Sequence, residues 1–194
     1  MVISALKLNL NTVNFSDEQF YQLCQKNGDL KLERTSTGEL IIMPPVGGES
    51  GNREADLIID LGVWNRQTGL GYTFSSSTIF KLPNGGDLSP DAAWIKKERW
   101  QTLTPEQKRK FPPIAPDFVI ELRSAIDDLK TLHQKMQEYM DAGVKLAWLI
   151  NTQQQEVKIY RFYRLGKDVE LRNLPTELLG EDILPGFSLS LDFY

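Results

Sequence analysis

Three acidic residues stand in segments of this sequence that are otherwise apolar, and the first of them is Glu54. It lies three and seven residues before Leu57 and Leu61, which places it on the apolar stripe of a predicted helix. A carboxylate on such a stripe is costly unless it is paired, hydrated or bound to a cation. Because Glu54 falls in the first turns, it could instead reach water and interact favourably with the positive end of the helix dipole.

The other two acids belong to predicted strands. Asp91 follows Pro90, which fixes the backbone at the start of a strand, beside a glycine-rich turn. Pro-Asp pairs are also common in ordinary turns, so this pair alone is weak evidence of a site. Glu121 lies in the apolar strand predicted over 117–123, where alternation places it on the same face as Arg123. Glu121 therefore needs a partner, and an ion pair with Arg123 is the simplest one.

Together the three acids would suit a hard divalent cation. Mg²⁺ takes oxygen ligands and is held by a few carboxylates together with water and phosphate. It polarises a phosphodiester and generates hydroxide from bound water at neutral pH, and Mn²⁺ is a possible substitute. Asp91, Glu121 and Glu54 are thus the candidate metal ligands.

Such a site also needs a fixed positive group near the developing phosphate charge. Arg123 could stabilise that charge but could not accept a proton, because a guanidinium does not deprotonate in proteins. Lys135 lies on the flank of the apolar stripe of another predicted helix, from which a long side chain can reach over the edge of the core. The alternative for Lys135 is an ordinary solvated helix lysine.

The elements that must position these residues alternate between helices and strands. Ser16 and Gln19 form a predicted capping box at the start of an N-terminal helix, which Asn27 and Gly28 end. Periodicity and turn residues then predict a hairpin (30–35 and 39–43), a helix (50–67), strands joined across a glycine turn (72–82 and 90–95), a short helix from residue 104, a strand (117–123), a helix (127–142) and a second hairpin (145–150 and 157–162). This order predicts an α/β or α+β fold.

Length and composition indicate a single domain over 1–194, since a chain of 194 residues can bury a sizeable core. One cysteine and one histidine exclude a structural zinc site and an intrachain disulfide. The first seven residues are too short for a secretory signal and no apolar run approaches a membrane span, so we expect a cytoplasmic protein. The net charge of -4 means that any DNA contact must use a local basic patch. Lysines and arginines within 96–110 could supply it, or could be a solvated surface.

The pattern of Pro90-Asp91, then Glu121-Leu122-Arg123, then a helix carrying Lys135 resembles the PD-(D/E)XK nuclease superfamily. More narrowly, the chain resembles the Uma-type branch of restriction-endonuclease-like proteins over about residues 15 to 190. The segments that carry this resemblance are 89–91, 116–121, 135–139 and 142–144 followed by 148–150. The resemblance implies a mixed central β-sheet flanked by helices, with Asp91 and Glu121 as metal ligands and Glu54 as an acid of the same site. It also implies homodimers.

This chain departs from the superfamily pattern at Arg123, which stands where the lysine of the E-X-K triplet belongs. In related proteins the neighbouring helix can supply that lysine, and Lys135 is the position to nominate. The leading hypothesis is therefore an Mg²⁺-dependent endonuclease that cleaves DNA. The alternatives are a catalytically silent member that binds DNA or dimerises, and a structural dimer whose acids form ion pairs only.

Overall fold

The computed structural model describes residues 5–10, 12–13, 15–163, 166–173, 175 and 177–191. A six-stranded sheet with the order β11-β10-β9-β8-β7-β4 carries most of the core. Among its strands only β8 and β9 run parallel, so the sheet is mixed, as the resemblance implies. Its strands are β4 (Gly71–Ser75), β7 (Ala92–Lys96), β8 (Phe118–Leu122), β9 (Leu146–Asn151), β10 (Glu156–Tyr163) and β11 (Gly166–Asn173).

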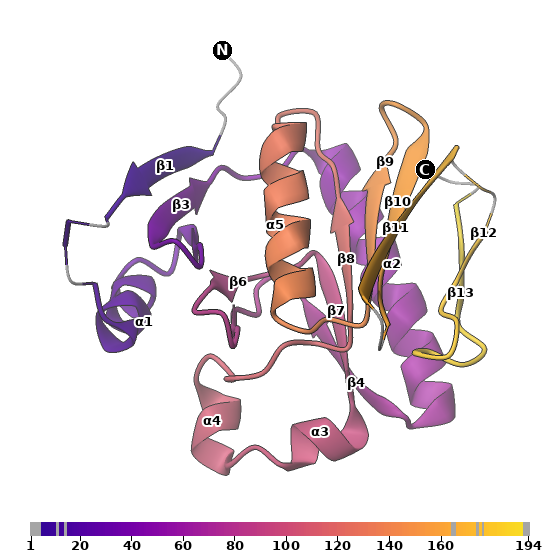
Figure 1. Ribbon diagram of the computed structural model, residues 1–194, viewed down its shortest axis with the longest axis horizontal. Coiled ribbons are helices and arrows are strands. Elements are labelled where there is room, and N and C mark those ends of the chain that lie inside the picture. Colours follow the sequence, from indigo (N-terminus) through magenta and orange to yellow (C-terminus); the bar gives the residue numbers. More distant parts are fainter. Residues whose placement is uncertain are drawn as a thin grey trace.

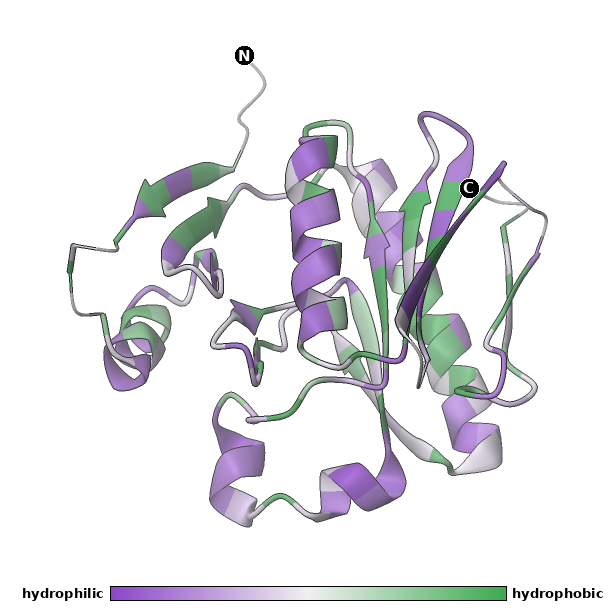
Figure 2. Ribbon diagram, viewed as in Figure 1, coloured by the Kyte–Doolittle hydropathy of each residue, from purple (hydrophilic) through white to green (hydrophobic). Residues whose placement is uncertain are grey.

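Two long helices cover opposite faces of this sheet (Figure 1). The helix α2 (Gly48–Thr68) buries Leu57, Leu61 and Trp64 on the face that presents Phe118 and Ile120. The helix α5 (Leu129–Asp141) buries its apolar stripe on the other face, against residues such as Val119. Strands β8 and β9 are therefore buried on both sides, which explains why they are mostly apolar (Figure 2).

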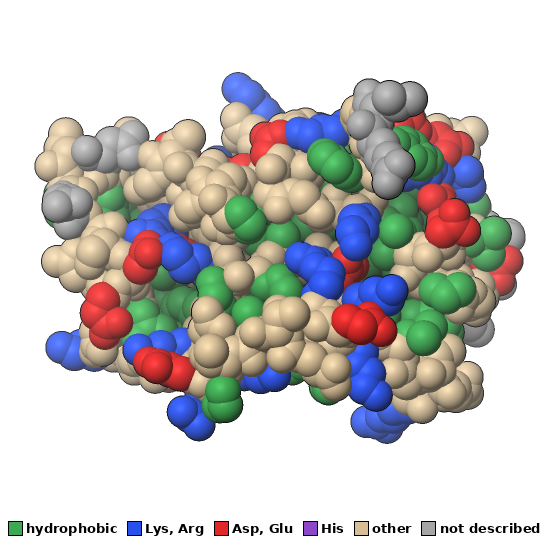
Figure 3. Space-filling model, turned by 60° about the horizontal axis from the view of Figure 1, so that its bottom comes forward, with side chains coloured by type: hydrophobic (Ala, Val, Ile, Leu, Met, Phe, Trp, Pro, Cys, Tyr) green, Lys and Arg blue, Asp and Glu red, His purple; other side chains and the backbone are tan. Residues whose placement is uncertain are grey.

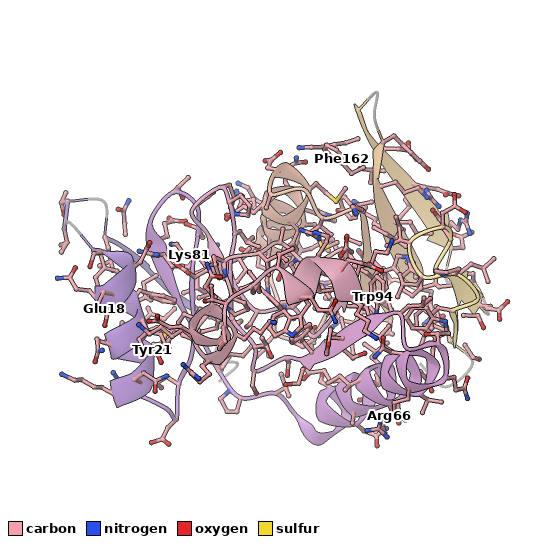
Figure 4. The ribbon with its side chains drawn as sticks, turned by 90° about the horizontal axis from the view of Figure 1, so that it is seen from below. Glu18, Tyr21, Arg66, Lys81, Trp94 and Phe162 are labelled. Carbon is pink, nitrogen blue, oxygen red and sulfur yellow. The ribbon has the colours of Figure 1, made fainter. Side chains whose placement is uncertain are left out.

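A close contact joins α2 to the strand pair β4–β7. The Trp64 and Trp94 rings meet edge to face with their centroids 5.6 Å apart. Asn65 Oδ1 accepts hydrogen bonds from Trp94 Nε1 at 2.8 Å and from the Gly71 amide at 3.0 Å. Figure 4 shows Trp94 beside α2, whereas Arg66 points away from the sheet on the outer side of that helix.

A second sheet, with the order β1-β3-β2-β6-β5, lies on the other side of α5 from the β10–β11 hairpin (Figure 1). The N-terminal helix packs against it and begins with the predicted Ser16–Gln19 capping box. Arg34 Nε donates to Asp87 Oδ2 at 2.7 Å inside this layer and links two of its strands. Its elements are β1 (Leu6–Asn9), α1 (Asp17–Lys26), β2 (Lys31–Arg34), β3 (Glu39–Met43), β5 (Phe80–Lys81) and β6 (Asp87–Leu88).

The remaining elements are short: α3 (Lys97–Gln101), α4 (Pro105–Arg109), β12 (Glu177–Leu179) and β13 (Ser188–Ser190). Thr104 caps α4 through a second capping box. None of the helices in the described part of the chain combines the length and the hydropathy needed to cross a bilayer. The expectation that residues 1–7 form no secretory signal falls partly on residues 1–4, which lie outside the described residues.

The glycine turn at 84–86 corrects one predicted connection. The sequence predicts one strand over 72–82 that this turn joins to a strand over 90–95. In the structure the first segment contains two strands, β4 and β5, and the unpredicted strand β6 lies between the turn and β7. The turn joins β5 to β6, with Gly85 at a φ of 94°, while β4 pairs with β7 in the other sheet. Because each half of this long segment serves a different sheet, one hairpin could not satisfy both.

Candidate active site

A cavity of about 580 Å³ opens between the two sheets, at the end of β8 and beside the first turns of α5. The N-terminal part of α2 reaches it from a third side. Its lining brings together four of the five residues that the sequence nominates: Glu54, Asp91, Glu121 and Lys135.

Asp91 is held at the start of β7, directly after Pro90. Its Oδ2 accepts a hydrogen bond from the Leu122 amide at 2.8 Å, which ties it to the end of β8. Its Oδ1 lies 3.8 Å from the Lys31 ammonium. Burial raises the pKa of Asp91, and the positive charges of Lys31 and Lys135 oppose that rise. The backbone therefore fixes one oxygen of this carboxylate, and the other lies near the Lys31 ammonium.

Glu121 is buried on the α5 face of β8. Its Oε1 accepts hydrogen bonds from Lys135 Nζ at 2.8 Å and from the Tyr139 hydroxyl at 2.9 Å. Burial raises the pKa of Glu121 to about 8, with further contributions from the nearby charges of Asp91 and Glu33, and Lys135 opposes this rise. The partner that such a buried strand glutamate needs is thus Lys135 from the facing helix.

Lys135 reaches from α5 into the site, and its side chain is 11% exposed. Besides Glu121, its ammonium contacts Glu33 Oε1 at 2.9 Å and the Ser89 carbonyl oxygen at 3.1 Å. Burial by itself lowers the pKa of Lys135, but the carboxylates of Glu121, Glu33 and Asp91 more than offset it and raise the pKa. These carboxylates therefore favour the charged form of Lys135.

Glu54 lines the same cavity from α2 and is half-buried. Burial raises its pKa, and the charge of Asp91 raises it further, whereas Lys31 and a hydrogen bond with Ser76 lower it. The like-charge effect of Asp91 shows that the two carboxylates share one electrostatic environment.

Arg123 lies apart from these residues. It is not among the described residues that line the cavity, and its Nη1 donates to Asn151 Oδ1 at 3.3 Å at the end of β9. The ion pair with Glu121 that strand alternation suggests is therefore replaced by the pair with Lys135. The Arg123 amide still donates to the Ile150 carbonyl oxygen at 2.9 Å, just after β8 ends at Leu122, but its side chain contacts Asn151 rather than Glu121.

Sequence reasoning missed Glu33, Lys31 and Tyr139. Glu33 lies in β2 and its side chain is only 1% exposed, while the neighbouring Lys31 and Arg34 make the strand look solvated in the sequence. Tyr139 belongs to the buried, apolar side of α5, where the sequence alone indicates only a packing role. The one available signal was that a buried tyrosine hydroxyl requires a hydrogen-bond partner.

The donor set of the cavity fits a divalent cation in charge. Next to Asp91 and Glu121 lie the carboxylates of Glu33 and Glu54 and the ammonium groups of Lys31 and Lys135. This group of six side chains carries two formal negative charges when its four acids are ionised, while further acids and Lys7 line the rest of the cavity. In the described part of the chain, no three His, Cys, Asp or Glu side chains already stand as a metal-binding group. Mg²⁺ commonly uses only one or two protein carboxylates and keeps several waters. A metal site with Asp91 and Glu121 as ligands therefore stays a prediction.

The basic segment 96–110 begins at the end of β7 and contains α3 and α4, which Figure 1 shows near the C-terminal end of α5. None of its residues lines the cavity. Several of its basic side chains form ion pairs with acidic ones, among them Arg99 with Asp117 at 2.9 Å and Lys110 with Glu106 at 3.5 Å. On the face turned forward in Figure 3, Lys and Arg side chains are interspersed with Asp and Glu. DNA contact through this segment stays a prediction.

Comparison with known proteins agrees with this architecture. No curated protein matches the chain. Among solved structures, the chain is similar to a putative nuclease from Anabaena variabilis ATCC 29413 belonging to DUF820, with a TM-score of 0.67 and 17% sequence identity over 82% of this chain and 86% of that chain. That likeness shows a shared fold. The family Uma2, described as "Putative restriction endonuclease", matches residues 17–192. The chain therefore belongs to the Uma2 family of restriction-endonuclease-like proteins.

Proposed function

We propose that this protein is an endonuclease that hydrolyses DNA phosphodiester bonds with Mg²⁺, or Mn²⁺ in its place. Family membership and fold support a nuclease. The observation that carries the proposal is the convergence of Asp91, Glu121 and Lys135 in one cavity from three separate elements. Burying two carboxylates side by side is costly, and a structural core has no need of it.

Asp91 and Glu121 would hold the cation. The Leu122 amide orients Asp91, and the Tyr139 hydroxyl orients Glu121, so neither carboxylate must be ordered when the site is loaded. When bound, Mg²⁺ polarises the phosphodiester and lowers the pKa of a bound water. Lys135 supplies a fixed positive charge next to Glu121, where it stabilises the negative charge that develops on the phosphate.

Hydrolysis forms one bond from a water oxygen to phosphorus and breaks one phosphorus–oxygen bond to the leaving sugar. The attacking water gives up a proton, and the leaving oxygen takes one from a solvent water. Glu54 is the nominated proton acceptor because its raised pKa brings it closer to neutral pH than an ordinary glutamate. Lys135 cannot take this role, since a protonated ammonium has no lone pair.

The rival is a member of the family that binds DNA or dimerises without cleaving. Two observations favour it: Arg123 replaces the motif lysine, and Lys31 and Lys135 already accompany the two principal acids. The two functions differ in whether the protein cleaves DNA, and the proposed one requires that cleavage depend on Asp91 and Glu121.

The test is cleavage of supercoiled plasmid with Mg²⁺ or Mn²⁺, together with calorimetric titration of Mn²⁺ into the metal-free protein. Asp91→Asn and Glu121→Gln keep the side-chain shapes and should each lower the cleavage rate at least about 100-fold and weaken Mn²⁺ binding. Glu177→Gln, at an exposed position of β12, is the matched control. Cleavage that survives both substitutions would mean a contaminant or a different centre, and the proposal would fall.

A further inference from the structure

Glu33 is a fourth carboxylate of the site, and its position is unusual for β2. One oxygen, Oε1, accepts hydrogen bonds from the Ser89 amide at 2.8 Å, from the Ser89 hydroxyl at 3.0 Å and from Lys135 Nζ at 2.9 Å. Its side chain is 1% exposed. A buried carboxylate with this many partners is held in a single orientation.

These contacts form a closed circuit. Lys135 Nζ donates to the Ser89 carbonyl oxygen, and the Ser89 amide and hydroxyl donate back to Glu33, which faces Lys135. Ser89 is two residues before Asp91, so the same circuit anchors the segment that carries a proposed cation ligand. Glu33 thus connects the second sheet both to Lys135 on α5 and to the segment that carries Asp91.

The ammonium of Lys135 has three N–H donors, and three acceptors surround it: Glu121 Oε1, Glu33 Oε1 and the Ser89 carbonyl oxygen. Without Glu33, one donor would lose its partner and the lysine would face Glu121 as its nearest carboxylate. The long side chain could then rotate, because four methylene groups allow many conformers.

We propose that Glu33 is a positioning residue that holds the Lys135 ammonium at Glu121 as an immobile cation. The role of Lys135 in cleavage rests on the proposed function, whereas the immobilisation itself does not. Lys135 and Tyr139 both contact Oε1 of Glu121, so Oε2 is the oxygen that this arrangement offers to a metal ion. A core role alone would not require a carboxylate at this position, because the two Ser89 donors could equally be satisfied by an amide oxygen.

The test compares Glu33→Gln with Glu39→Gln. Glutamine keeps the shape of residue 33 and can still accept from Ser89, but it removes the negative charge at Lys135. Glu39 lines the same cavity from β3, yet it is not one of the three acceptors around Lys135 Nζ. Its substitution removes the same charge from the cavity and so controls for the overall electrostatic change.

The direct readout is the ammonium signal of Lys135 in NMR spectra of ¹⁵N-lysine-labelled protein, assigned by its loss in Lys135→Arg. In the wild type the buried ammonium should exchange slowly with water, and Glu33→Gln should accelerate that exchange at least about tenfold, while Glu39→Gln should not. In cleavage assays Glu33→Gln should lower kcat about 10- to 100-fold, the range typical of residues that orient a site's ligands, with KM within about threefold. Should Glu33→Gln not fold, Glu33→Asp, which shortens the side chain by one methylene, takes its place with the same expected direction.

Equal exchange rates in the wild type and Glu33→Gln would overturn the inference, and so would an equal effect of Glu39→Gln. If the wild type cleaves no DNA but the Lys135 signal responds to Glu33→Gln, the positioning role stands and the nuclease proposal fails. The two ideas are therefore separated by one pair of variants.

Discussion

Lys135 and Arg123 are the two cations that sequence reasoning nominates, and their surroundings differ. Lys135 contacts Glu121 inside the cavity, whereas Arg123 contacts Asn151 outside its lining. We expect Lys135→Met to lower the single-turnover cleavage rate at least about 100-fold, as loss of one charge-stabilising group does elsewhere. Arg123→Met should stay within about threefold of the wild type.

Lys135→Met also leaves buried carboxylates unpaired, which costs about 3–5 kcal/mol of folding free energy. Circular dichroism at the assay temperature must therefore show folded protein, and Lys135→Arg provides a second variant that keeps the charge. If Lys135→Met protein were folded and fully active while Arg123→Met protein were inactive, Arg123 rather than Lys135 would be the cation that stabilises the phosphate charge.

The site residues that the sequence could reveal are charged residues that interrupt an apolar pattern. Glu121 stands out because four of its six neighbours in 118–124 are apolar, and Glu54 stands out on an apolar helix stripe. Glu33 interrupts no such pattern, since Lys31 and Arg34 flank it in a strand that alternation would place at a surface. Its burial depends on α5 and Ser89, which contact it from far along the chain.

Among the elements, the β4–β7 pair depends on a glycine. A Cβ atom at Gly71 would lie 2.3 Å from the Ile95 carbonyl oxygen and 2.4 Å from the Trp94 ring, and neither can move freely. We expect Gly71→Ala to lower the free energy of unfolding by about 2–3 kcal/mol, as overpacking of a tight core does. Urea denaturation measures this change.

Gly62 is the matched control, because it lies inside α2 and a Cβ there meets no atom within 4 Å. Gly62→Ala should raise the free energy of unfolding by up to about 1 kcal/mol through helix propensity. If both substitutions shifted stability in the same direction, the packing of β4 against β7 would not be the reason for glycine at position 71.

Elements with strong periodicity were predicted well, and those without it were missed. The helices α2 and α5, the strand β8 and the β9–β10 hairpin all appear within a few residues of their predicted bounds. Strand β11 was missed because nearly all its side chains are exposed and charged residues interrupt its apolar ones. The three-residue strands β12 and β13 are too short to show any alternation.

At the scale of the whole molecule, the cavity is acidic. Eight acidic and three basic residues line it, and the chain carries a net charge of -4. A DNA phosphate approaching this cavity is repelled unless a divalent cation is bound. We expect a short DNA duplex to bind at least about tenfold more tightly in Ca²⁺ than in EDTA at matched ionic strength, measured by fluorescence anisotropy.

Asp91→Asn is the control for that measurement, because it removes a proposed cation ligand without adding bulk. It should abolish most of the difference between Ca²⁺ and EDTA. Equal affinity in the two buffers for the wild type would place the DNA contact elsewhere, for example on α3 and α4. The homodimer implied by the resemblance stays a prediction.

The parallel pairing of β8 and β9 has a consequence for how such sites are sought. A parallel pair needs a crossover, and here the crossover is α5, which returns across the sheet and carries Lys135 to within 2.8 Å of Glu121. The acid and its cation are thus neighbours in space although 14 positions separate them in the chain. A sequence motif with lysine two residues after the acid does not match this protein. A three-dimensional template of carboxylate and ammonium groups would match it.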